Sequence, residues 1–214
     1  MFRSALLLAA SAVTLAAQSS FEGAVSMTLS GENGRSQDIT YMLKDGKIRM
    51  EMNGGRAGGM ASIIYDLSAK KMLMIMTEQK MYIEQSLAGA AQSAARGAAA
   101  GATLKRTGQM ETIAGYPCEH VTVTENAGAS SDVCVAKGLG AWQMPSAGGM
   151  RGGPPRTESW EGGLGEDGFP LKVQKGDKTI MLVSKIDKKS LDASLFSPPD
   201  GFMKMDMGGV MKRP

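Results

Sequence analysis

The sequence contains few of the residues that build rigid cores or active sites. Aromatic residues make up 5% of its 214 residues, and it has one histidine, His120, and two cysteines. A Ser-His-Asp arrangement would have to use His120, and no G-x-S-x-G nucleophile motif is present. The net charge of +3 is too small and too evenly spread to indicate nucleic-acid binding. The sequence therefore predicts no cofactor and a protein that is not an enzyme.

Long apolar runs are also missing after the N-terminus, where a membrane span would need about 18 consecutive apolar residues. The N-terminus MFRSALLLAASAVTLAAQSS has Arg3, an apolar run from Ala5 to Ala17, and then small residues. This layout is typical of a secretory signal peptide, with a buried N-terminal helix as the alternative. We predict a signal peptide at 1–19 and a single domain at 20–214. The mature protein is then exported and soluble, in the periplasm or secreted.

The two cysteines, Cys118 and Cys134, predict a disulfide because an even pair in an exported protein is usually oxidised. It would close a loop of about 15 residues and contribute roughly 3 kcal/mol in the chain-entropy model. The alternative is a metal site, since Cys118 and His120 would project to one face of a strand, with Cys134 opposite. An oxidised pair cannot bind metal as thiolates.

Apolar and polar residues alternate with a period of two over most of the chain after the signal peptide, which is the pattern of strands with one buried face. Asp45-Gly46 marks a tight hairpin turn, and further turns are expected at 68–70 and 78–80. The pattern up to Ile83 predicts a meander of about six antiparallel strands. Later strand pairs are predicted from Val121 and Val123 with 133–135, and from 169–173 with 179–183.

An alanine-rich segment, 87–104, interrupts the strand pattern, and alanine is the best helix former. It predicts a mid-chain helix, with a low-complexity linker as the alternative. The Gly- and Pro-rich stretch at about 145–157 predicts a mobile loop. Trp142 and Trp160 flank that loop, where they could anchor a lid, contact a membrane surface or pack at the sheet edge. The expected fold class is mainly β, a β-rich α+β fold.

The most unusual segment is KKMLMIMTEQKMYIE at 70–84, in a chain with 18 methionines. Within it, residues 72–76 are apolar on both faces, with methionines on one face and Leu73 and Ile75 on the other, and such a strand is normally covered on both sides. One cover could be the alanine-rich helix or a lid loop, and the other a ligand, because the flexible thioether adapts to variable shapes. Ordinary core packing is the alternative. The residues predicted to line an apolar cavity are Ile48, Met50, Met52, Met72, Met74 and Met76.

A copper site is a further alternative, because thioethers select Cu(I) and M-x-M spacing recurs along the chain. The candidate ligands are Met203, Met205 and Met207, interleaved with charged residues near the C-terminus, together with His120.

Several short motifs carry a resemblance over nearly the whole mature chain: F-E-G near residue 21, Y-M-L-K-D-G-K-I-R-M-E, G-Y-P-C at 115–118, G-F-P-L at 168–171 and S-L-F-S-P-P-D-G-F at 194–202. The sequence resembles an exported bacterial family known only as a domain of unknown function. That family is similar to the LolA/LolB-type half-barrel carriers of lipoproteins. The resemblance implies a curved antiparallel half-barrel sheet wrapped round the mid-chain Ala-rich helix, with an apolar concave face. It implies no catalytic residues.

These observations predict a non-catalytic periplasmic binding or carrier protein for an apolar ligand, a lipid or lipidated protein, with transient membrane contact. The alternatives are a periplasmic copper-binding protein that uses methionine clusters, and a structural or interaction module without a small ligand.

Overall fold

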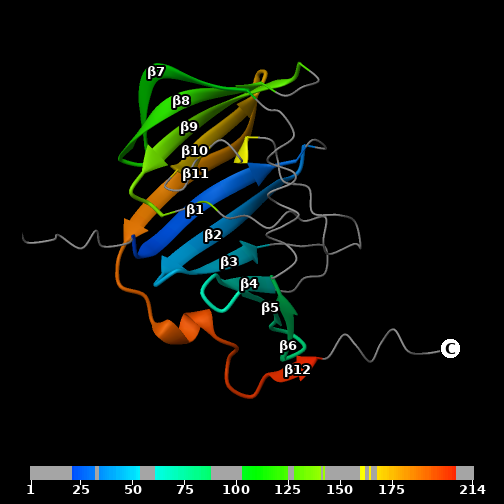
Figure 1. The fold of residues 1–214 in the computed structure, drawn as a ribbon. Coiled ribbons are helices and arrows are strands. Elements are labelled where there is room, and N and C mark those ends of the chain that lie inside the picture. The colour runs from blue at the N-terminus through cyan, green and yellow to red at the C-terminus, as the bar shows by residue number, and fades with distance from the viewer. Residues whose placement is uncertain are drawn as a thin grey trace, which may run out of the picture.

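The computed structural model describes residues 21–31, 34–53, 61–87, 103–124, 128–140, 142, 160–161, 164 and 168–205. These residues form one open sheet of 12 strands in the order β12-β6-β5-β4-β3-β2-β1-β11-β10-β9-β8-β7 (Figure 1). The strands are β1 Gly23–Ser30, β2 Ser36–Lys44, β3 Lys47–Asn53, β4 Ala61–Asp66, β5 Lys71–Met76, β6 Met81–Ser86, β7 Thr103–Ile113, β8 Tyr116–Thr124, β9 Ser130–Lys137, β10 Gly168–Lys175, β11 Lys178–Lys188 and β12 Met203–Met205.

The predicted meander is confirmed, because β1 to β6 lie side by side in chain order. The predicted tight turn at Asp45-Gly46 is present, where Lys44 of β2 pairs with Lys47 of β3. Asp45 and Gly46 between them have φ of 48° and 71°. Two positive φ angles match the right-handed twist of the flanking strands, and Asp-Gly is a preferred sequence for such a turn.

The second half of the chain extends the sheet from the other side of β1, where β11 pairs antiparallel with β1. From there β10, β9, β8 and β7 follow in reverse chain order, so β7 is one edge of the sheet. The predicted pairs β8–β9 and β10–β11 are both present. The opposite edge is the short β12, which runs parallel to β6 and was not predicted from the sequence.

One face of the sheet carries the main hydrophobic core, and we call it the core face. The register places Val25 of β1 beside Tyr41 of β2, and Tyr41 beside Met50 of β3. The same cluster of buried residues continues to Val133 of β9 and Val173 of β10. A single apolar layer therefore runs along nearly the whole sheet.

The opposite face, the outer face, has its own smaller cluster at the β3–β6 end. Ile64 of β4 and Ile75 of β5 pack there against Leu191 and Phe196 from the segment after β11. Arg49 of β3 donates a hydrogen bond from Nη1 to the Leu195 carbonyl oxygen at 2.7 Å. Strand β5, which carries Met72, Met74 and Met76, is thus covered on its outer face by the segment that follows β11. That segment contains the 3-10 helix Ala193–Phe196.

The predicted sheet wrapped round a mid-chain helix is wrong, and so is the α+β class. Within the described residues, the sheet is open and no α-helix is present. Residues 88–102 of the alanine-rich segment lie outside the described residues. Its last two residues, Thr103 and Leu104, begin β7 and pair with Thr124 and Val123. Cross-strand pairing outweighs a local helix preference worth only tenths of a kcal/mol per residue.

The predicted signal peptide at 1–19 and the predicted loop at about 145–157 both lie outside the described residues. Within the described part of the chain, no helix is long and apolar enough to cross a membrane.

Candidate functional site

The six residues predicted to line an apolar cavity lie together on the core face. Met50 pairs with Ile63 of β4, and Ile63 pairs with Met74 of β5. Directly paired residues on adjacent strands point to the same side of a sheet. Two parallel rows flank this one, Ile48–Tyr65–Met72 and Met52–Ala61–Met76. The sequence pattern found each strand, and the register shows that the three strands contribute to one patch.

The patch continues across β6 to the edge of the sheet. Met76 pairs with Met81 of β6, and Met81 pairs with Met203 of β12. In the next row, Met74 pairs with Ile83, which pairs with Met205. We call this surface the methionine face. It consists of Ile48, Met50, Met52, Met72, Met74, Met76, Met81, Met203 and Met205.

Exposure of the methionine face increases toward the edge of the sheet. Met50 is 3% exposed, Met74 is half-buried, and Met203 at the edge is 66% exposed. Met52, Met72, Met76, Met81 and Met205 are half-buried like Met74. The face is therefore continuous with the main core at Ile48 and Met50 of β3, and its other methionines are partly accessible.

A polar atom without a partner lies within this apolar surface. Tyr65 sits between Ile48 and Met72 in its row, and its side chain is buried. Among the described residues, its hydroxyl has no hydrogen-bond partner. Burial raises the pKa of Tyr65, with a further contribution from Tyr41, so the hydroxyl keeps its proton. An unpaired buried donor costs about 1–3 kcal/mol, so this hydroxyl would gain from an acceptor.

Four aromatic residues gather where the core face passes from β2 to β10. Trp142 stacks on Tyr41 with ring centroids 5.4 Å apart, and meets Phe169 edge-on at 5.3 Å. The ring centroids of Trp160 and Trp142 lie 6.2 Å apart, and Nε1 of Trp160 has no hydrogen-bond partner in the described part of the chain. Both tryptophans are buried in the main core. The predicted packing at the sheet edge is wrong, because Trp142 packs against β2 and β10, which lie in the middle of the sheet.

The close approach that seats these tryptophans depends on Gly168 at the start of β10. A Cβ at Gly168 would lie 2.0 Å from the carbonyl oxygen of Leu164. The Gly168 carbonyl in turn accepts a hydrogen bond from the Trp142 backbone N–H at 3.3 Å. Only glycine allows the backbone around Leu164 to come this near to the strand.

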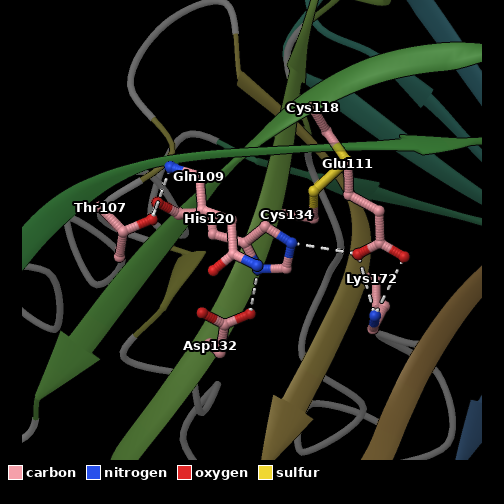
Figure 2. Close-up of a disulfide and its surroundings, with 8 residues drawn as sticks. All are labelled: Thr107, Gln109, Glu111, Cys118, His120, Asp132, Cys134 and Lys172. Carbon is pink, nitrogen blue, oxygen red and sulfur yellow. Dashed lines mark hydrogen bonds and ion pairs between the residues drawn. A yellow bond between two sulfur atoms is a disulfide. The ribbon is translucent and has the colours of Figure 1, made fainter.

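The outer face carries a chain of charged groups at the β7–β10 end, around the disulfide (Figure 2). Lys172 Nζ donates to both carboxylate oxygens of Glu111, at 2.9 and 3.2 Å. Glu111 Oε2 lies 3.0 Å from His120 Nε2, and His120 Nδ1 lies 2.6 Å from Asp132 Oδ1. The four residues come from β10, β7, β8 and β9, so the chain of contacts ties four strands together.

The predicted disulfide is present between Cys118 and Cys134, with Cα atoms 5.3 Å apart. Cys134 pairs with His120 of β8, and Cys118 pairs with Glu111 of β7. Both cysteines are buried beneath the charged side chains. A buried disulfide is consistent with export to an oxidising compartment.

Strand β7 has a register shift next to this group of charged residues, and a hydrogen bond from the shifted segment fixes its position against β8. The β7–β8 register shifts between Arg106 and Met110, and Gly108 within it has φ of 75°. Thr107 at the shift donates its hydroxyl to the His120 carbonyl oxygen at 2.8 Å. Lys172, followed by His120, lowers the pKa of Glu111, so its carboxyl group stays ionised.

The residues of the copper alternative are not brought together. Met203 and Met205 lie on β12 at one edge of the sheet, whereas His120 lies on β8 near the other. Met207 lies outside the described residues. The sequence pattern did not identify Tyr65 as a site residue, although Tyr65 alternates with Ile63 in β4. Glu111, Asp132 and Lys172 carried no sequence signal, because their proximity depends on strand pairing far along the chain.

A family model described as "Domain of unknown function (DUF4412)" matches residues 21–202. The chain belongs to this family. The match covers every strand of the sheet except β12, and it confirms the part of the predicted resemblance that concerned a family of unknown function. No curated protein matches the DUF4412 chain.

One solved structure shows a similar fold in another protein. A crystal structure of an uncharacterized conserved protein from Thermus thermophilus has a TM-score of 0.52 at 9% identity, covering 88% of this chain and 91% of that one. A structure of PNGF-II matches with a TM-score of 0.47 at 14% identity, and the match spans 32% of the PNGF-II chain. Neither is described as a lipoprotein carrier, so the likeness to LolA/LolB-type carriers stays a prediction.

Proposed function

We propose that this chain is a non-catalytic periplasmic binding protein whose methionine face holds an amphipathic molecule of the lipid class. The ligand has an apolar chain and a hydrogen-bond acceptor, such as a carboxylate or ester oxygen, at one end. Carriage of a lipid or lipidated protein is the corresponding biological role.

The observation that carries the proposal is the register of β3, β5, β6 and β12, which collects thioethers on one face and leaves several of them half-exposed. Unbranched thioether side chains refit around flexible apolar molecules, as at other adaptable binding surfaces. A closed core would bury these side chains as fully as it buries Val25 and Val133, both 0% exposed.

The polar end of the ligand is inferred from Tyr65. Its buried hydroxyl is a donor without an acceptor among the described residues, and it lies in the row that continues through Met72 to Gln85 of β6. An acyl chain lying along the Met74 and Met76 rows would bring an oxygen at one end within reach of this row. Small-molecule sites commonly combine apolar walls with a few polar groups that set the ligand's orientation.

The test is a calorimetric titration of the purified mature protein with oleate below its micelle concentration. Tyr65→Phe should weaken binding about 2- to 10-fold, because one hydrogen bond is worth about 0.5–1.5 kcal/mol. Tyr82→Phe is the matched control, since Tyr82 belongs to the outer-face cluster on β6. Its affinity should equal that of the wild type.

A second variant pair tests the face itself. Met74→Lys places a charge in the middle of the patch and should abolish binding, whereas Met110→Lys, on exposed β7, should not change it. The proposal fails if oleate does not bind saturably, or if all four variants bind as the wild type does.

A further inference from the structure

We propose that Glu111, His120 and Cys134 form a site for a zinc-like divalent cation that is occupied only when the Cys118–Cys134 disulfide is reduced. The disulfide and the bound metal ion then exclude each other, because both use the sulfur of Cys134. The proposal is independent of the ligand assigned to the methionine face.

The three donor atoms are already gathered. A carboxylate oxygen of Glu111, a ring nitrogen of His120 and the Sγ of Cys134 all lie within 4.8 Å of one another. They come from β7, β8 and β9, three adjacent strands, so the sheet fixes their spacing. Oxygen, nitrogen and thiolate sulfur are the three ligand types that zinc accepts in proteins.

The histidine is oriented as a metal ligand would be. Its Nδ1 faces Asp132 Oδ1 at 2.6 Å, so an Nδ1–H can donate to that carboxylate and leave the Nε2 lone pair for a metal. A carboxylate behind the imidazole is the usual partner of zinc-bound histidine. Nε2 and Glu111 Oε2 are 3.0 Å apart, close to the separation of about 3.3 Å between two such ligands in a tetrahedral zinc site.

Glu111 can serve the ion without losing its other partner. Lys172 Nζ contacts Oε1 at 3.2 Å as well as Oε2 at 2.9 Å. If Oε2 binds the ion, Oε1 still accepts from Lys172, which keeps the carboxylate in place.

The sulfur is what makes the site redox-dependent. In the disulfide, Cys134 Sγ is bonded to Cys118 Sγ and cannot act as a thiolate. A dithiol reductant supplies two electrons and two protons, giving two cysteine thiols and its own disulfide. Zinc then displaces the proton of the Cys134 thiol. Breaking the S–S bond also frees the Cys134 side chain to move toward Nε2 and Oε2.

A matched pair of cysteine variants isolates the role of Cys134. Cys118→Ser and Cys134→Ser break the same disulfide, so they lose the same cross-link. Only Cys118→Ser keeps the sulfur that lies with Glu111 and His120. We expect Cys118→Ser to bind one zinc ion per chain at least tenfold more tightly than Cys134→Ser, measured by competition with a chromophoric chelator.

Three further measurements complete the test. Wild-type protein reduced with a phosphine should bind zinc, and the oxidised protein should not. Cobalt added to Cys118→Ser should give the near-ultraviolet absorption of a thiolate–cobalt bond. Glu111→Gln or His120→Gln in that background should weaken binding at least tenfold, while Glu119→Gln, on the core-face side of β8, should not.

The proposal is overturned if Cys118→Ser and Cys134→Ser bind zinc equally, or if oxidised and reduced wild type bind it equally. It is also overturned if no cobalt–thiolate absorption appears. Circular dichroism checks that each variant is folded, and if Cys118→Ser does not fold, the comparison of reduced with oxidised wild type decides.

Discussion

The two ends of the core face are built from different side chains. At the β8–β10 end, the apolar layer is made largely of Val121, Val123, Val133 and Val173, all buried. At the β3–β6 end, most of the layer is methionine, and several of these side chains are half-exposed. The disulfide and the Lys172–Glu111–His120–Asp132 contacts brace the outer face behind the valines.

This difference in side chains gives the two ends different roles: the valine end stabilises the fold, and the methionine end can adapt to a ligand. Valine is restricted at χ1 and packs in one way, so a valine layer braced by a disulfide is rigid. Methionine has three rotatable bonds and fills irregular space, so a methionine layer can change shape at little cost. The aromatic cluster around Phe169 lies between the two ends.

The largest effect is expected at the aromatic junction. Phe169 is fully buried and contacts the rings of both Tyr41 and Trp142, so Phe169→Ala should lower the free energy of unfolding by about 3–5 kcal/mol. Urea denaturation followed by tryptophan fluorescence measures this loss. A loss below about 1 kcal/mol would show that the junction is not part of the rigid scaffold.

Reduction of the disulfide should follow in size. The two cysteines are 16 positions apart, and a loop of this size corresponds to about 3 kcal/mol in the chain-entropy model. Amide hydrogen exchange should show the loss of protection first in β8 and β9, with β3–β5 affected less. Equal loss of protection at both ends would contradict a brace that acts locally.

A pair of leucine substitutions compares the two ends directly. Val133→Leu adds a methylene to a fully packed layer and should cost about 1–3 kcal/mol. Met74→Leu conserves volume at the adaptable end and should cost less than about 1.5 kcal/mol. Thermal unfolding of the two variants, side by side, gives the difference. A larger cost for Met74→Leu would reverse our assignment of rigid and adaptable ends.

The smallest effect is an acid-dependent one at the charged chain. Lys172 lowers the pKa of Glu111 from its usual 4.5, so this contact stabilises the fold above pH 4.5 and is lost as the pH falls through the lowered pKa. Lys172→Met should therefore be less stable than the wild type near pH 7, and the gap should shrink in acid. Urea midpoints across pH 3–7 test this, and a gap that widens in acid would contradict it.

Much of the fold was predictable because its strands are local in sequence. Asp45-Gly46 and the alternation around Met50 predict a hairpin from neighbouring residues alone. The alanine-rich segment gave a wrong prediction for the same reason, because composition reports only local preference. Thr103 and Leu104, at the end of that segment, are in a strand paired with β8. The three-residue β12 is too short to show a period and exists only through its pairing with β6.

The sites were predictable only in part. Alternation placed Met72, Met74 and Met76 on one face, but only the register adds Met81 and Met203. The contacts between Glu111 and Lys172 join residues 61 positions apart on strands that are not neighbours. Such contacts depend on the β7 register shift and on the order of the strands, neither of which a single sequence reveals.

The most direct test of the methionine face uses the methionines themselves as probes. The mature protein is labelled with ¹³C in the methionine methyl groups, and methyl spectra are recorded as oleate is added. Binding at the face predicts shifts at Met72, Met74 and Met76, with none at buried Met27 of β1 or at exposed Met110 of β7. Unchanged spectra, or shifts at Met110 as large as those at Met74, would contradict the proposed function.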